Sequence, residues 1–130
     1  MRIEHVAFNV EKPVEAAQWL VANLGMRVVR KVDSPLQTHF LADAASATML
    51  ELYHNPKAPV LDYASMDPIT LHIAFTVDDV GAARQKLLAA GAKPEGEVTT
   101  TPDGDELAMV RCPAGFVIQL MKRAKPLLDK

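Results

Sequence analysis

The clearest pattern along the chain is an alternation of apolar side chains with polar or small ones that occurs twice. Residues 5–10 read His-Val-Ala-Phe-Asn-Val and residues 72–77 read His-Ile-Ala-Phe-Thr-Val, so four of the six positions are identical. Because successive side chains of a strand point to opposite faces of a sheet, each stretch predicts a β-strand with one apolar face. The recurrence predicts an internal repeat whose two copies have the same local structure.

Each of these stretches is followed by a helical pattern. Pro13 suits the first turn of a helix, and Asp79 suits the N-cap of a second helix. Gly25 and Gly91 come where each apolar stripe ends, a position that favours a glycine in the left-handed conformation. The predicted apolar stripes consist of Val14, Ala17, Val21 and Leu24 in the first helix and of Val80, Ala83, Leu87 and Ala90 in the second.

After each glycine the sequence contains three further strand-like stretches, separated by turn-forming residues. They lie near residues 27–33, 37–43 and 48–54 in the first half and near residues 94–100, 105–112 and 116–122 in the second half. Each half is therefore predicted to be a βαβββ module, which gives an α+β fold. We expect one compact domain made of a first module at residues 1–54, a connection at 55–69, a second module at 70–123 and a loosely held tail at 124–130.

Composition and charge narrow the classes of function. The chain has 130 residues, 49% hydrophobic side chains and a formal net charge of −2, so no general basic field would attract nucleic acid or an anionic membrane. No apolar stretch resembles a membrane span or a signal peptide. Cys112 is the only cysteine, which excludes an internal disulfide and fits a reducing compartment. We therefore expect a cytoplasmic protein that binds neither nucleic acid nor membranes.

Four polar side chains are predicted to lie on the sheet faces that do not meet the helices. His5 and His72 begin the repeated strands, and their apolar neighbours take the helix side. Glu51 and Gln119 alternate with leucine or isoleucine in the final strands of the two modules, at equivalent positions. A single histidine on a strand is more often a hydrogen-bonded structural residue than a ligand. Two imidazoles together with a carboxylate and an amide nevertheless form a mixed nitrogen and oxygen donor set, which predicts one divalent metal ion (Zn, Ni, Fe, Mn or Co).

Four further side chains are candidates for contact with a small-molecule substrate. Arg30 and Arg111 suit bidentate binding of a carboxylate or a phosphate. Tyr53 and Met121 suit an adaptable apolar lining. For each of the four, the alternative is an ordinary strand or core residue.

Two histidines are not assigned to the metal. His54 follows Tyr53 at the end of a strand and is predicted to be structural. His39 lies in a middle strand whose facing is not fixed by the pattern, so that burial in the core and lining of a pocket both stay open.

These motifs resemble those of the vicinal oxygen chelate superfamily, which includes glyoxalase I, methylmalonyl-CoA epimerase, extradiol dioxygenases, fosfomycin resistance enzymes and bleomycin-binding proteins. The resemblance covers about residues 2–122 and is closest to glyoxalase I around Glu51 and His72. It is carried by His5, by Leu-Glu-Leu-Tyr-His-Asn at residues 50–55, by His-Ile-Ala-Phe-Thr-Val and by Gly-Phe-Val-Ile-Gln-Leu at residues 115–120. It implies a cupped mixed sheet built from two βαβββ modules, with the helices on the outer face, and a homodimer.

The resemblance also implies four ligand positions, which map onto His5, Glu51, His72 and Gln119. The fourth is usually glutamate in the metal-dependent enzymes of the family. Gln119 can offer an amide oxygen to a metal, but it cannot act as a general base. Whether the ligands of one site come from one chain or from two stays open.

The implied function is that of a metal-dependent lyase or isomerase of the glyoxalase type, which stabilises an enolate of a small oxygen-chelating substrate and uses Glu51 as a catalytic residue. The alternative is a non-catalytic protein that binds a drug or a metabolite, as the bleomycin-binding members do. An extradiol dioxygenase is less favoured, because that chemistry would need a carboxylate at position 119.

Overall fold

The computed structural model describes residues 1–128 and consists of two compact units, Met1–Asp62 and Tyr63–Lys130. The division falls within residues 55–69, the segment predicted to connect the modules. Residues 129 and 130, the last two of the predicted tail, lie outside the described residues. No helix within residues 1–128 combines the length and the apolar character that crossing a membrane requires.

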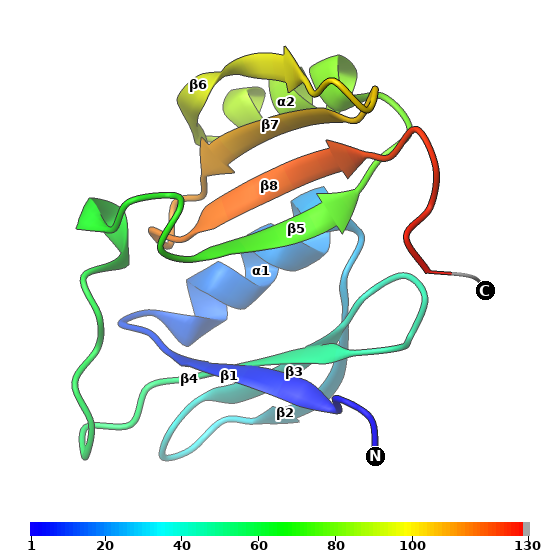
Figure 1. Cartoon of the computed structure of the whole chain (residues 1–130). Coiled ribbons are helices and arrows are strands. Elements are labelled where there is room, and N and C mark those ends of the chain that lie inside the picture. Colours follow the sequence, from blue (N-terminus) through cyan, green and yellow to red (C-terminus); the bar gives the residue numbers. More distant parts are fainter. Residues whose placement is uncertain (129–130) are drawn as a thin grey trace. The chain divides into compact units, whose positions relative to one another are not determined.

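The first unit is a four-stranded mixed sheet with one helix (Figure 1). Its elements are β1 (His5–Asn9), α1 (Pro13–Leu24), β2 (Arg27–Val32), β3 (Thr38–Ala42) and β4 (Met49–Tyr53). The strands lie in the order β1–β4–β3–β2, with β1 parallel to β4 and the other neighbours antiparallel. Helix α1 packs against β3 and β4, which leaves the opposite face of the sheet for polar side chains.

The second unit repeats this arrangement after a short 3-10 helix (Figure 1). Its elements are η1 (Tyr63–Ser65), β5 (His72–Thr76), α2 (Val80–Ala89), β6 (Lys93–Thr100), β7 (Glu106–Arg111) and β8 (Val117–Lys122). The strand order is β5–β8–β7–β6, with β5 parallel to β8. The α+β fold of two βαβββ modules, predicted from the repeat, is confirmed.

The two helices begin and end as the sequence predicts. Helix α1 starts at Pro13, and Gly25 follows it in the left-handed conformation with φ of 67°. Helix α2 starts after Asp79, whose Oδ1 accepts a hydrogen bond from the Ala82 N–H at 2.9 Å. Gly91, with φ of 103°, follows the C-cap of α2. These positive φ angles turn the chain out of each helix and toward the next strand.

The buried face of α1 differs from the predicted stripe. Val21 was predicted to be buried, but it is 37% exposed. The buried residues of the helix are Pro13, Ala16, Ala17 and Leu20. Pro13, Ala16 and Leu20 each lie one residue before a member of the predicted stripe, so the buried face is shifted by one residue and shares only Ala17 with that stripe. The sheet selects the stripe whose small alanines allow the helix to pack closely.

Helix α2 buries a charged residue that the predicted stripe did not include. Val80 and Leu87 are buried as predicted, and Arg84 is buried between them. Arg84 Nη2 donates to the Gly96 carbonyl at 3.1 Å and lies 3.4 Å from the carboxylate of Glu97. A long side chain can pack its apolar stem against a core while its charged end reaches polar partners, which explains why Arg84 lies on the inner face of the helix.

Each sheet buries the face that carries its helix. Leu41 and Leu52 in the first unit and Ile118 and Leu120 in the second are fully buried at 0% exposure. Burying one such side chain contributes about 1.5–3 kcal/mol to stability. The alternation of the strands then directs the intervening polar residues to the other face.

Candidate functional site

The strand register places the four predicted metal ligands at matching positions of the two modules. Glu51 on β4 lies opposite the residue two positions after His5 on β1. Gln119 on β8 lies opposite the residue two positions after His72 on β5. Paired residues and residues two apart share a face of a sheet. Each module therefore holds its histidine and its glutamate or glutamine on one face, away from its helix.

In the first unit, His5 and Glu51 form a close pair. His5 Nε2 lies 3.5 Å from Glu51 Oε1, and His5 Nδ1 lies 2.9 Å from Glu4 Oε1. Because a carboxylate accepts hydrogen bonds, the contact with Glu4 assigns a proton to Nδ1, and Nε2 is the ring nitrogen that lies toward Glu51. Phe40 meets the imidazole edge to face, with ring centroids 5.5 Å apart. His5 Nε2 and Glu51 Oε1 therefore face each other, an arrangement that a cation between them, either a proton or a metal ion, would stabilise.

The separation of this pair fits two neighbouring ligands of one metal ion. Zinc bonds of about 2.1 Å to nitrogen and oxygen place two ligand atoms roughly 3.0–3.4 Å apart. The observed 3.5 Å between Nε2 and Oε1 needs only a small adjustment to meet this range. The side chains of His5 and Glu51 are 36% and 18% exposed, so water and a small ligand can reach the pair.

In the second unit, His72 is held as the same tautomer. Its Nδ1 donates to the Pro68 carbonyl at 2.8 Å, which makes Nε2 the nitrogen with the lone pair. Gln119 is half-buried on the neighbouring strand. Histidines that bind metals commonly donate their other ring N–H to a carboxylate or a carbonyl in this way. Both modules thus orient a histidine as a metal ligand requires, one through a side chain and the other through the backbone.

Each unit supplies half of the predicted donor set. Within residues 1–128, no three His, Cys, Asp or Glu side chains are close enough together to hold a metal ion. The first unit brings together His5 and Glu51, and the second holds His72 and Gln119 at matching positions. The assignment of all four to one ion stays a prediction.

Three of the four predicted substrate contacts lie on the same sheet faces as the ligands. Arg30 is exposed on β2, in the row of paired residues that contains Glu51. Tyr53 is half-buried two residues beyond Glu51, and Met121 is buried two residues beyond Gln119. Their role in binding a substrate stays a prediction.

The fourth predicted contact, Arg111, is tied to the second unit itself. Its side chain is 12% exposed, and four of its N–H groups donate hydrogen bonds. The acceptors are Glu95 Oε1 at 2.7 Å and the carbonyls of Tyr63 at 2.7 Å, Gly115 at 3.0 Å and Met66 at 2.8 Å. This geometry supports a structural role for Arg111, which holds η1 and the segment after it against β7.

Histidines 39 and 54 also have structural positions. His39 is 4% exposed on the helix side of the sheet, opposite Leu52, and its ring bonds the Gln37 carbonyl at 2.7 Å. The side chain of His39 therefore faces the core on the helix side of the sheet. His54 donates from Nδ1 to the Val10 carbonyl at 2.8 Å, which fits the role predicted for it.

Glu4 is a residue of this site that the sequence analysis missed. Strict alternation along a strand would place Glu4 and His5 on opposite faces. Glu4 precedes the first residue of β1, so its side chain can turn to His5 Nδ1. An acidic residue directly before a candidate ligand at the start of a strand is the signal that would have identified it.

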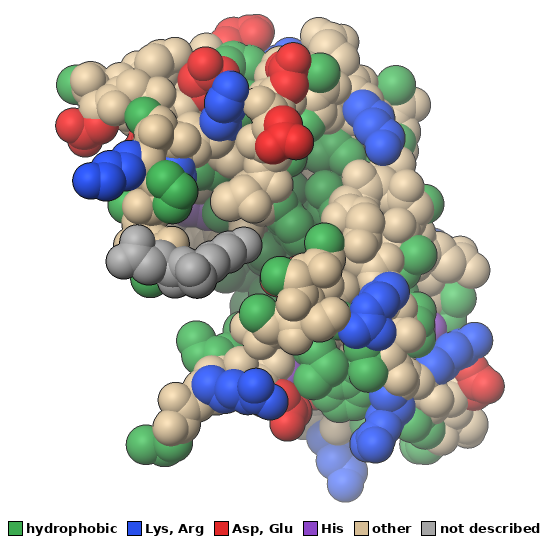
Figure 2. Space-filling view, turned by 90° about the vertical axis from the view of Figure 1, so that its right-hand side faces the viewer, with side chains coloured by type: hydrophobic (Ala, Val, Ile, Leu, Met, Phe, Trp, Pro, Cys, Tyr) green, Lys and Arg blue, Asp and Glu red, His purple; other side chains and the backbone are tan. Residues whose placement is uncertain are grey.

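Charged side chains are mixed on one face of the molecule. Figure 2 shows acidic and basic groups interspersed there, in keeping with the formal net charge of −2.

Solved structures resemble this chain over most of its length. The crystal structure of SMU.1112c is 27% identical, with a TM-score of 0.73 over 94% of this chain and 98% of that one. TnmS3, an antibiotic binding protein from Streptomyces sp. CB03234, is 21% identical, with a TM-score of 0.70 over 95% and 97% of the two chains. A glyoxalase I mutant from Zea mays is 24% identical, with a TM-score of 0.76 over 95% of this chain but 46% of that one. At identities below 25%, the latter two show similarity of fold.

Comparison at the level of sequence assigns the family. No curated protein matches the chain. The family model described as Glyoxalase/Bleomycin resistance protein/Dioxygenase superfamily matches residues 2–120, which is nearly the whole sequence. The chain therefore belongs to the glyoxalase/bleomycin resistance protein/dioxygenase superfamily.

Proposed function

We propose that the protein is a metal-dependent lyase or isomerase that acts on a small substrate with two neighbouring oxygens. His5, Glu51, His72 and Gln119 would be the ligands of a divalent ion. The observation that carries the proposal is the His5–Glu51 pair, whose Nε2 and Oε1 atoms are 3.5 Å apart. A bound ion would supply Lewis-acid stabilisation of the negative charge that develops beside a substrate carbonyl.

The residues of the chain have separate roles in the proposed reaction. Glu51 is the only carboxylate among the four positions, so it is the group that would take a proton from the carbon next to the carbonyl and return it. Glu4 and Phe40 fix the tautomer and the plane of the His5 ring. Gln119 has no proton affinity near neutral pH and would contribute an oxygen only.

A non-catalytic binding protein is the second candidate function. Two observations favour it: the similarity in fold to an antibiotic binding protein, and the glutamine at position 119. In this case the same sheet faces would enclose an organic ligand without proton transfer.

Metal analysis tests the first function. Protein purified without added metal is expected to contain a divalent ion by mass spectrometry. His5→Ala and His72→Ala are each expected to lose it, since each removes a nitrogen donor. His54→Gln is the matched control, because His54 bonds a backbone carbonyl, and it should keep the ion. Stoichiometric metal in both alanine variants would refute the ligand assignment.

Proton exchange separates the enzyme from the binding protein. Hydroxyacetone has oxygens on two adjacent carbons, and its hydroxyl-bearing carbon, next to the carbonyl, carries the hydrogens that would exchange, so it is a suitable probe. The metal-loaded protein should exchange these hydrogens with D₂O, as followed by NMR. A metal-free protein that binds an organic ligand tightly and catalyses no exchange would favour sequestration.

A further inference from the structure

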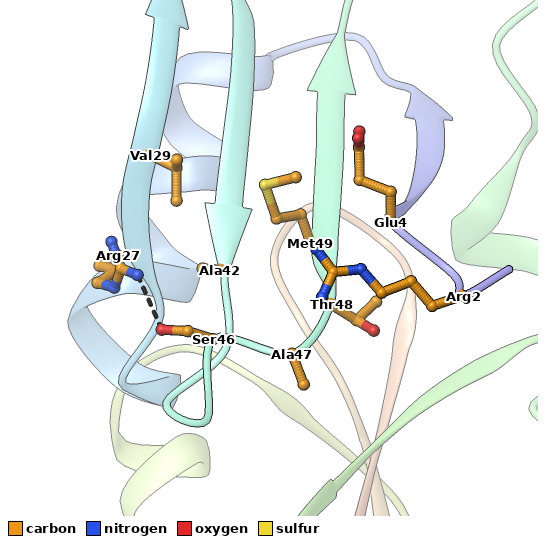
Figure 3. Close-up of a pocket in the computed structure, with 9 residues that line it drawn as sticks. All are labelled: Arg2, Glu4, Arg27, Val29, Ala42, Ser46, Ala47, Thr48 and Met49. Carbon is orange, nitrogen blue, oxygen red and sulfur yellow. Dashed lines mark hydrogen bonds between the residues drawn. The ribbon is translucent and has the colours of Figure 1, made fainter.

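The first unit contains a second polar site, at the end of its sheet where β1 and β4 begin (Figure 3). It is a pocket of about 160 Å³ formed by the residues before β1, the start of β2 and the turn between β3 and β4. Its polar lining includes Arg2, Arg27, Ser46 and Thr48.

The pocket has more hydrogen-bond donors than acceptors. Arg27 Nη2 donates to Ser46 Oγ at 2.8 Å, as the dashed line in Figure 3 marks. Since this oxygen accepts from Arg27, the Ser46 hydroxyl proton is available to a ligand. Arg2 adds a second guanidinium to the lining. The one carboxylate in the lining, Glu4, is bonded through Oε1 to His5 Nδ1 at 2.9 Å.

The turn between β3 and β4 holds Ser46 in a special conformation. Ser46 has φ of 56°, a value that non-glycine residues rarely adopt. Two hydrogen bonds to Asp43 maintain it, from the Ser46 N–H to the backbone carbonyl at 3.0 Å and from the Ala47 N–H to Oδ1 at 3.0 Å. The serine that meets Arg27 is therefore fixed by the turn.

The size and position of the pocket limit what it can bind. Pockets for drug-sized ligands usually have roughly 300–1,000 Å³, so this one suits a single charged group with a few carbons. Val29, Ala42 and Met49 supply apolar contacts beside the donors. Met49 lies opposite His5 in the sheet, so the pocket adjoins the predicted metal ligand.

We propose that this pocket binds the oxyanion of a small organic acid, which is either a carboxylate or a phosphate. Arg27 and Ser46 form the fixed part of the site, and Arg2 adds charge. Anion binding stands on its own geometry. That the anion belongs to the substrate rests on the proposed function.

Titration of the metal-free full chain tests the proposal. The protein, treated with EDTA, is titrated separately with inorganic phosphate and with propionate at constant ionic strength, while NMR follows the backbone amides of Ser46 and Ala47. Saturable shifts are expected with at least one anion, and the anion that saturates at the lower concentration identifies the natural group. Arg27→Met should weaken this binding about tenfold or more, because the variant lacks the charged guanidinium group that can donate two hydrogen bonds to an oxyanion.

Matched variants make the result specific. Lys31→Met removes the same charge from the same strand on the opposite face and should leave the affinity unchanged. Ser46→Ala should weaken binding several-fold and provides a second test should Arg27→Met fail to fold. Absence of saturable shifts with both anions, or equal losses in Arg27→Met and Lys31→Met, would overturn the proposal. Because no metal is present in the titrations, failure of the metal assignment would leave this outcome untouched.

Discussion

The two modules share a fold and a histidine at matching positions, but only one of them has a carboxylate at the matching position of its final strand. At matching positions, the final strand of the first module has Glu51 and that of the second has Gln119. A carboxylate can bind a metal through a full charge and can also accept a proton, whereas an amide offers a neutral oxygen alone. Under the proposed function, two modules of the same fold would form an asymmetric site in which only the first module can take up a proton.

The modules also differ in how they orient their histidines. The His5 ring is held by the side chain of Glu4, whereas the His72 ring is held by the backbone carbonyl of Pro68. A substitution can remove the first partner but cannot remove the second. The orientation of a proposed metal ligand can therefore be changed by substitution in the first module, without changing the histidine itself.

The largest expected effect comes from exchanging the acid and the amide. Glu51→Gln should slow hydrogen exchange in hydroxyacetone by roughly 10²- to 10⁴-fold, the usual contribution of a general base. Gln119→Glu should keep the exchange activity and bind metal at least as tightly, since it adds a charged ligand. NMR exchange rates of the metal-loaded proteins provide the measurement. Equal losses in both variants would contradict the assignment of proton transfer to the first module.

Much of the structure that the two modules share could be predicted from local signals in the sequence. The repeated strands, the starts of the helices at Pro13 and after Asp79, and the glycines that follow them depend on neighbouring residues. The alternation of the strands also placed His5 and Glu51 on one face. Each of these features is decided within a few residues, where backbone sterics and periodicity dominate.

Features decided by distant contacts were not predictable in the same way. Helix α1 has two candidate apolar faces that are shifted by one residue, and only its packing on β3 and β4 leaves Val21 exposed. The facing of His39 depends on its pairing with Leu52 in another strand. Arg111 is tied to carbonyls such as that of Tyr63, which is far away in the sequence. A pattern in one segment carries no information about such partners.

A core substitution tests whether the two modules are equally stabilised by their helix-facing sides. Leu52 and Leu120 occupy matching positions and are both fully buried. Leu52→Ala and Leu120→Ala should each lower the free energy of unfolding by about 2–5 kcal/mol. Urea unfolding followed by circular dichroism measures the loss. Val32→Ala, at a site that is 47% exposed, is the control and should change stability by about 0.5 kcal/mol or less.

A smaller effect is expected when the partner of His5 is changed. Glu4→Gln keeps the size of the side chain but removes the charge that holds Nδ1–H. Substitutions of groups that orient a ligand typically lower metal affinity by about 10- to 100-fold. Zinc titration by calorimetry measures the change, with the exposed Glu11→Gln as a control for loss of one negative charge. Equal affinities in Glu4→Gln and the parent protein would show that His5 needs no orienting carboxylate.

The smallest effect concerns a carboxylate of the second module. Asp105 accepts hydrogen bonds from the Ala124 N–H at 2.9 Å and from Arg123 Nη1 at 2.8 Å. The bond from Ala124, and after it the bond from Arg123, holds the pKa of Asp105 below its ordinary value of 3.8. A lowered pKa in the folded state means that the ionised group stabilises the protein above this value. The contribution is lost as the pH falls below it.

Asp105→Asn should therefore be less stable than the parent protein by a constant amount between about pH 5 and about pH 7. The difference should shrink as the pH falls below about 4, since the carboxyl of the parent then becomes protonated. Urea unfolding across this range measures it, and Asp103→Asn, exposed in the same turn, controls for the loss of charge. A difference that stays constant down to about pH 3 would mean that the shape of the side chain holds residue 124 in place and its charge does not. In that case the hydrogen bonds between the turn before β7 and the segment after β8 would stabilise the protein without a charged side chain at position 105, just as the uncharged Gln119 occupies its position in the same module.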